Sequence, residues 1–260
     1  MILDQIIADR KVSVESLKEK KSIEEFERQI ENSKFNHYSL KNALQNKMNP
    51  INIIAEVKKA SPSKGLICKT FPYLEIAKAY EEGKAAAISV LTEPKYFQGE
   101  NTYLTEIKEQ VNVPILRKDF IIDPIQIYEA KAIGADALLL IVAALEIKDL
   151  HNYLKLATCL GMEVLVETHD EREVEIALEA GADIIGVNNR NLQTFEVNLA
   201  TSERLRALVP NDKVFVAESG IHTEEDVKRL KSIQVDALLI GESIVKSVNP
   251  MQKLQQLMKA

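Results

Sequence analysis

A glutamate and a lysine follow a short apolar stretch in a pattern that suits acid–base chemistry. Residues 51–55 read Ile-Asn-Ile-Ile-Ala, a β-branched run typical of a buried strand. Glu56 and Lys58 come next, and side chains two apart on a strand point to the same face. The loop 61–65, Ser-Pro-Ser-Lys-Gly, adds hydroxyls and one cation. Taken alone, this pattern fits either a reactive pair or a strand-end ion pair beside an ordinary turn.

The same kind of residue ends three other apolar runs further along the chain. They are Lys118, Glu167 and Glu218. Lysines and glutamates crowded into a low-dielectric site shift one another's pKa, which suits general acid and base roles near neutral pH. The recurrence favours one functional site over four unrelated ion pairs, provided that the fold brings these strand ends together.

Short apolar runs alternate with amphipathic helical segments from residue 51 onward. Helix signals separate the runs, such as Asp123-Pro124, an N-cap followed by proline at the first helical position. Strands that alternate with such helices predict parallel βαβ units. The eight predicted strands are Ile51–Val57, Ala85–Leu91, Val113–Lys118, Ala137–Val142, Glu163–Glu167, Ile184–Asn188, Val214–Glu218 and Ala237–Gly241.

A short sequence that connects the end of a helix to the next strand is repeated along the chain, and it indicates that the βαβ units form a closed barrel. An aspartate precedes the strand in each of three copies about fifty residues apart, at Asp136, Asp183 and Asp236. Eight units with this repeat predict an α/β fold, a (β/α)8 TIM barrel. In such a barrel the charged residues at the ends of the odd-numbered strands would lie around one opening, the mouth of the barrel. An open, doubly wound sheet is the alternative, but no Gly-x-Gly-x-x-Gly follows the first strand.

The N-terminal segment is helical in pattern and contains no predicted strand. We expect a single domain over residues 1–260, in which a helical extension, 1–47, packs onto a barrel, 48–260. Apolar residues recur at helical spacing from Ile2 to Ile6, and this stripe is expected to pack near the barrel mouth.

Composition excludes several classes of function. The net charge is −6 and no long basic run occurs, so nucleic acid is not an expected partner. No apolar run approaches the roughly 18 residues of a membrane helix, and the first residues do not resemble a signal peptide. Cys68 and Cys159 lack metal-type spacing, and the histidines are scattered. These features predict a cytoplasmic protein without a metal site.

Glycines follow the last two predicted strands, where barrels often bind phosphate. Gly220 and Gly241 would allow the backbone to approach an anion closely. Ser219 or Ser243 could add a hydroxyl, and Ser61 could complete the site from the first loop. A pair of tight turns is the alternative interpretation.

Three further residues in the loops could contact a substrate, whereas one histidine is not predicted to take part in catalysis. Asn188 and Arg190 follow the sixth strand and could orient a substrate. Phe97, after the second strand, could cover an aromatic ligand. His169 lies beside Asp170, a predicted helix cap, and is interpreted as a loop residue and not as a base.

Several of these stretches resemble the signatures of indole-3-glycerol phosphate synthases. They are residues 54–65, residues 116–120 (Leu-Arg-Lys-Asp-Phe), residues 165–167, residues 186–192 (Gly-Val-Asn-Asn-Arg-Asn-Leu) and residues 217–221 (Ala-Glu-Ser-Gly-Ile). The resemblance covers almost the whole chain in the same order. Glu242 stands where some members carry serine, which leaves that phosphate contact to the backbone amide.

The resemblance implies a reaction and a role for each charged residue. Members close the pyrrole ring of 1-(2-carboxyphenylamino)-1-deoxyribulose 5-phosphate, losing carbon dioxide and water, in tryptophan biosynthesis. By resemblance, Lys118 is the general acid, Glu167 the general base, and Lys58 holds anionic groups and shares acid work. The orienting residues are then Glu56, Asn188 and Glu218, and the substrate-binding residues are Ser61, Phe97, Arg190, Ser219, Gly220, Gly241 and Glu242.

The resemblance implies that the partner is a phosphorylated small molecule. It also implies that no cofactor is needed, since the ring nitrogen of the substrate provides the electrons. We expect the protein to be a monomer.

Two other functions are compatible with parts of the sequence. A phosphoribosylanthranilate isomerase would share the glycine loops, but not the helical extension together with Lys58, Lys118 and Glu167. A barrel that senses a metabolite without catalysis would need a pocket but no acid–base set.

Overall fold

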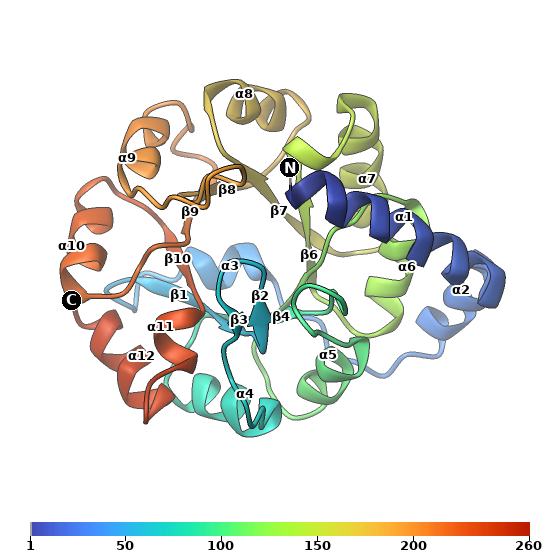
Figure 1. The fold of residues 1–260 in the computed structure, drawn as a ribbon, viewed down its shortest axis with the longest axis horizontal. Coiled ribbons are helices and arrows are strands. Elements are labelled where there is room, and N and C mark those ends of the chain that lie inside the picture. The colour runs from blue at the N-terminus through green and yellow to red at the C-terminus, as the bar shows by residue number, and fades with distance from the viewer. Residues whose placement is uncertain (1) are drawn as a thin grey trace.

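Eight parallel strands close into a barrel within residues 2–260, the part of the chain that this computed structural model describes (Figure 1). The hydrogen-bonded order runs β1-β10-β9-β8-β7-β6-β5-β4 and returns to β1. The strands are β1 (Asn52–Val57), β4 (Ala87–Leu91), β5 (Ile115–Lys118), β6 (Ala137–Ile141), β7 (Glu163–Thr168), β8 (Ile184–Asn188), β9 (Val214–Glu218) and β10 (Ala237–Ile240). The predicted TIM barrel is confirmed, and the open-sheet alternative is wrong.

Helices follow the strands and surround the barrel (Figure 1). They are α4 (Tyr73–Glu82), α5 (Asn101–Lys108), α6 (Pro124–Ala132), α7 (Ile147–Cys159), α8 (Glu171–Glu179), α9 (Ala200–Arg206), α10 (Glu224–Ser232), α11 (Glu242–Val245) and α12 (Pro250–Met258), with a 3-10 turn at Val142–Ala144. Asp123 caps α6 as predicted, and its side chain accepts the N–H of Ile125. A small hairpin, β2 (Ala60–Ser61) and β3 (Gly65–Leu66), forms in the loop after β1. No helix among residues 2–260 is long and apolar enough to cross a membrane.

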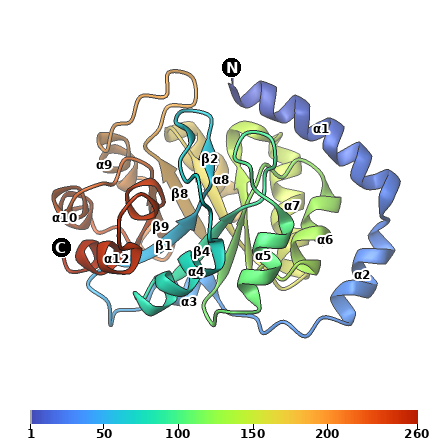
Figure 2. The same cartoon turned by 60° about the horizontal axis from the view of Figure 1, so that its bottom comes forward.

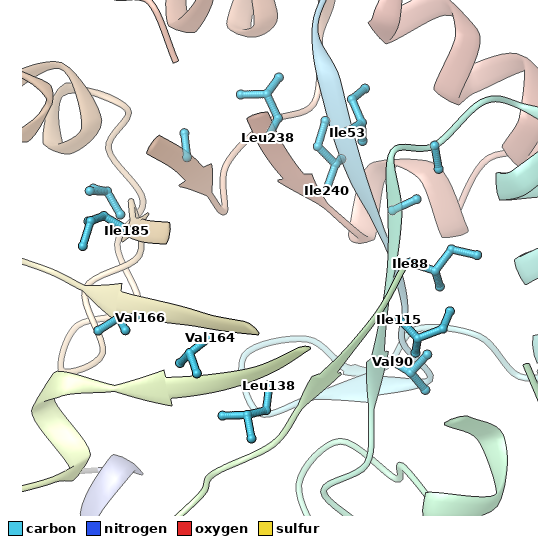
Figure 3. Close-up of a cluster of buried hydrophobic side chains, with 14 of the residues drawn as sticks. Ile53, Ile88, Val90, Ile115, Leu138, Val164, Val166, Ile185, Leu238 and Ile240 are labelled. Carbon is cyan, nitrogen blue, oxygen red and sulfur yellow. The ribbon is translucent and has the colours of Figure 1, made fainter. Parts of the chain in front are cut away.

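Alternating side chains on each strand divide the core into two layers. Ile88, Val90 and Ile115 lie on the outer side of their strands, where they pack against the helices (Figure 3). The inner layer fills the barrel and includes Ile54, Leu116, Leu165 and Val216. Each of these four lies two residues before Glu56, Lys118, Glu167 or Glu218, and therefore shares a face with that charged residue. The interior of the barrel is therefore apolar, and its charged residues lie at the carboxyl ends of the strands, which form the mouth.

The end of the barrel opposite the mouth is closed by α3 (Leu40–Leu44). Leu40 and Leu44 are fully buried and belong to the inner layer of the core. The carboxylate of Glu163, at the start of β7, accepts the Ser39 hydroxyl and the Lys41 N–H, both at 2.8 Å. Part of the segment interpreted as an extension therefore completes the barrel core.

The rest of the extension lies along the outside of the barrel. Figure 2 shows α1 (Ile2–Lys20) beside α6, and the chain passing from α2 (Ile23–Glu31) beneath the barrel to α3. Arg10 of α1 is buried, and its guanidinium lies 3.3 Å from the carboxylate of Asp119. Lys18 pairs with Asp123 at 2.6 Å. These contacts tie α1 to the loop that directly follows β5.

Two of the three repeated aspartates brace neighbouring strands, Asp136 from a buried position and Asp236 from a partly buried one. Asp136 accepts the N–H of Ile115 at 2.7 Å and pairs at 2.6 Å with Lys108, whose side chain is only 1% exposed. Asp236 accepts the N–H of Phe215 at 2.8 Å. Asp183 differs, because its side chain is 58% exposed and pairs with Lys213 at 2.9 Å.

We expect Asp136→Asn to lower the free energy of unfolding by about 3 kcal/mol, because it leaves the Lys108 cation buried without a counter-charge. Asp183→Asn, at the equivalent but exposed position, should cost less than about 1 kcal/mol. Urea denaturation of both variants at neutral pH measures the difference. Equal small losses in the two variants would contradict the bracing role of Asp136.

Candidate active site

The carboxyl ends of the strands surround one cavity, and every residue predicted for the site lines it. The predicted catalytic residues are Glu56, Lys58, Lys118, Glu167, Asn188 and Glu218, and the predicted substrate-binding residues are Ser61, Phe97, Arg190, Ser219, Gly220, Gly241 and Glu242. The fold therefore brings together all of the strand ends singled out in the sequence.

Lys118 lies at the centre of the charged cluster. Its Nζ is 3.1 Å from Glu167 Oε2 and 3.1 Å from Glu218 Oε2. Burial alone would lower the pKa of Lys118, but the carboxylates of Glu218, Glu167 and Glu56 together raise it. Lys118 is therefore a cation at neutral pH, held by carboxylates from alternate strands of the barrel.

The two carboxylates that bind Lys118 differ in their other partners. Glu167 Oε1 accepts the Asn188 amide at 3.1 Å and lies 3.3 Å from His169 Nε2. Burial would raise the pKa of Glu167, but Lys118, His169 and Asn188 together lower it. Burial raises the pKa of Glu218 to about 7, and the Glu167 charge adds to that rise. Glu218 therefore takes up a proton more readily than Glu167, which stays ionised.

Two glycines leave the space that two of the carboxylates occupy. A Cβ built on Gly186 would overlap Glu218 Oε1, and a Cβ on Gly241 would overlap Glu56 Oε2. The sequence suggested that Gly241 lets an anion approach the backbone. In the structure, the Glu56 side chain already requires glycine at this position.

The loops predicted to bind phosphate lie at one side of the cavity. Ser219 and Gly220 both have positive φ angles, 67° and 80°, which turn the chain sharply after β9. Ser243 donates its hydroxyl to the Ile221 carbonyl at 3.0 Å, so this hydroxyl links the two loops. Glu242 pairs with Lys246 at 2.7 Å and lies 4.0 Å from Lys64 of the first loop.

Apolar side chains form the opposite wall of the cavity. The rings of Phe97 and Phe120 are tilted with their centroids 6.0 Å apart. Leu3 and Ile6 of α1 line the same cavity and are themselves almost completely buried. The expectation that the stripe of the extension packs near the mouth is confirmed.

His169 does not line the cavity, but it contacts a residue that does, Glu167, from the loop position that the sequence suggested. Its Nδ1 is 2.9 Å from Glu173 Oε2, and the side chain is 15% exposed. The contact with Glu167 follows from the spacing of residues 167 and 169, because residues two apart on an extended chain share a face. The same reasoning that found Glu56 and Lys58 applies to this pair. Within residues 2–260, no group of His, Cys, Asp or Glu side chains is arranged to hold a metal ion.

Comparisons with known proteins agree with this geometry. The family model for indole-3-glycerol phosphate synthase matches residues 3–257. An indole-3-glycerol phosphate synthase of Endomicrobium trichonymphae is 55% identical over 258 residues, covering 99% of each chain. The enzyme of that name from Ruminiclostridium cellulolyticum is 51% identical over 251 residues, covering 95% of each.

Solved structures of low sequence identity share the fold alone. A 3-hexulose-6-phosphate synthase from Salmonella typhimurium has a TM-score of 0.65 at 14% identity and covers 80% of this chain and 97% of its own. A thiamine phosphate pyrophosphorylase from Pyrococcus furiosus has a TM-score of 0.62 at 16% identity, over 82% and 96%. The full-length match to the family model and to these relatives decides the identity: the chain belongs to the indole-3-glycerol phosphate synthase family.

Proposed function

We propose that Lys118 is the general acid and Glu167 the general base with which this protein closes the indole ring. As a member of its family, the protein converts 1-(2-carboxyphenylamino)-1-deoxyribulose 5-phosphate to indole-3-glycerol phosphate, in tryptophan biosynthesis. The single observation that carries the assignment is the position of Lys118 Nζ, 3.1 Å from Glu167 and 3.1 Å from Glu218. A cation and a base so close together can face one substrate from two sides.

In the first step, the substrate ketone accepts the proton of Lys118. The ring carbon that bears the carboxylate attacks the ketone carbon, and a carbon–carbon bond forms. The bond to the carboxylate then breaks, carbon dioxide leaves, and its electron pair restores the aromatic ring. General acid catalysis of such a step typically contributes about 10²- to 10⁴-fold in rate.

In the second step, water leaves from the former ketone carbon and the new ring loses a proton. Glu167 accepts that proton, since its carboxylate is held ionised beside Lys118. The departing hydroxyl needs a second proton from Lys118. Glu218, whose pKa is raised to about 7, can return one to Lys118 across 3.1 Å.

The remaining groups of the substrate find complementary surroundings. We assign the phosphate to the loops at Ser219-Gly220 and Gly241-Glu242, which lie after β9 and β10 where barrels often bind it. Lys58, in contact with Glu56, supplies a cation for an anionic group and shares acid work. The aromatic ring fits between Phe97 and Ile6.

Substitution of the acid and of the base should stop the reaction at different stages. Lys118→Met blocks the first step, so it should release almost no carbon dioxide from carboxyl-labelled substrate. Glu167→Gln keeps the shape of the side chain but removes its basicity, so it should release carbon dioxide without forming the fluorescent indole product. Each should lower kcat by about 10²-fold or more.

Lys213→Met provides the matched control, because Lys213 also pairs with a carboxylate, Asp183, but lies away from the cavity. It should keep full activity. Normal release of carbon dioxide by Lys118→Met, with a native circular dichroism spectrum, would show that Lys118 is not the acid for ring closure. Lys58 would then be the next candidate.

The contribution of α1 to substrate binding can be tested on two apolar residues of that helix. Ile6 is 3% exposed and lines the cavity, whereas Val12 is 72% exposed and faces away from it. Ile6→Ala should raise KM about tenfold, because it removes apolar contact with the ligand. Val12→Ala should leave KM unchanged. Equal KM values for the two variants would mean that α1 stabilises the barrel without contacting the substrate.

A further inference from the structure

We propose that His169 is a positioning residue for the general base, holding the Glu167 carboxylate so that Oε2 faces Lys118 and the substrate. The inference rests on the proposed role of Glu167. His169 follows directly after β7, and its Nε2 lies 3.3 Å from Glu167 Oε1. Asn188 donates to the same oxygen at 3.1 Å. The His169 contact is an ion pair without the geometry of a hydrogen bond. Because the imidazole and the Asn188 amide both lie against Oε1, Lys118 contacts the other oxygen, at 3.1 Å.

The orientation of the imidazole is itself fixed by the start of the next helix. Glu173 Oε2 accepts the backbone N–H of His169 at 2.8 Å and lies 2.9 Å from its Nδ1. Glu173 is in turn placed by Asp170, which caps α8 by accepting the Glu173 N–H at 2.9 Å. The partner of one ring nitrogen determines what the other can do. The α8 cap therefore aims Nε2 at the base.

The charge on His169 gives this contact a role during the reaction. Burial would lower the pKa of His169, but the carboxylates of Glu167 and Glu173 raise it to about 10. The imidazole is therefore a cation at neutral pH. When Lys118 gives its proton to the substrate, it loses the charge that kept Glu167 ionised. His169 retains its own charge, so Glu167 remains a carboxylate until the second step.

Other charged groups lie near the ring without replacing these contacts. The cavity on the outer side of His169 is also lined by Asp170, Arg190, Glu196 and Arg204. Arg190 donates to the Phe195 carbonyl at 3.3 Å, and Arg204 pairs with Glu171. Glu167 and Glu173 are the carboxylates in direct contact with the imidazole.

Two substitutions of His169 distinguish the effect of its contact with Glu167 from the effect of its positive charge. His169→Asn retains a donor near Nδ1 and loses the reach to Glu167, whereas His169→Gln places a neutral donor near Nε2. We expect His169→Asn to lower kcat about tenfold with KM changed less than about twofold, and His169→Gln to lose less. Without the imidazolium the pKa of Glu167 should rise in both variants, and the chemical shift of its carboxyl carbon measures that rise directly. His151→Asn, at an exposed position on α7, is the matched control.

A double-mutant cycle with Glu167→Gln decides whether His169 acts through the base. If it does, His169→Asn should cost nothing further in kcat once Glu167 is replaced. An additive loss in kcat, or an unchanged Glu167 pKa in His169→Asn, would overturn the positioning role. Urea denaturation shows whether the variant is folded. Failure of the proposed function looks different, because Glu167→Gln alone would then keep normal kcat.

Discussion

The site depends on one constraint: a buried lysine must be surrounded by enough negative charge to remain a cation. Removing a charge from water is costly unless partners compensate it, and one carboxylate would form only a neutral pair. Here Lys118 is 3.1 Å from each of two carboxylates, and Glu56 adds a third negative charge nearby. The excess of negative charge keeps Lys118 protonated. Burial, together with the charges of Glu167 and Glu56, raises the pKa of Glu218.

The barrel meets this constraint through its geometry. Parallel strands that alternate inward and outward place residues of alternate strands in one layer, so the four charged side chains meet around the axis. Glycine provides the space, at 186 within β8 and at 241 directly after β10, where a side chain would overlap Glu218 or Glu56. The apolar inner layer and α3 exclude water from below. Loops and α1 line the open end of the barrel.

The barrel and the charged layer were predictable from the sequence because both follow from local periodicity. An apolar run of period two that ends in a charge locates Lys118 or Glu167 without knowledge of distant residues. The closure of the barrel floor by Leu40 and Leu44, and the requirement for glycine at 241, depend on contacts with remote parts of the chain. His169 is a loop residue, as predicted, and its contact with Glu167 could have been inferred from their spacing. Its second partner, Glu173, could not, because that contact depends on the folded start of α8.

The most direct test of this account is an NMR titration of the side-chain carboxyl carbons of Glu167 and Glu218, assigned with the two Glu→Gln variants. Glu218 should titrate near pH 7, whereas Glu167 should stay ionised well below the ordinary glutamate value of 4.5. In Lys118→Met, which removes the shared cation, the pKa values of both carboxyls should rise. If both carboxyls titrated together near 4.5 in the unmodified protein, the charged cluster around Lys118 would not exist as described.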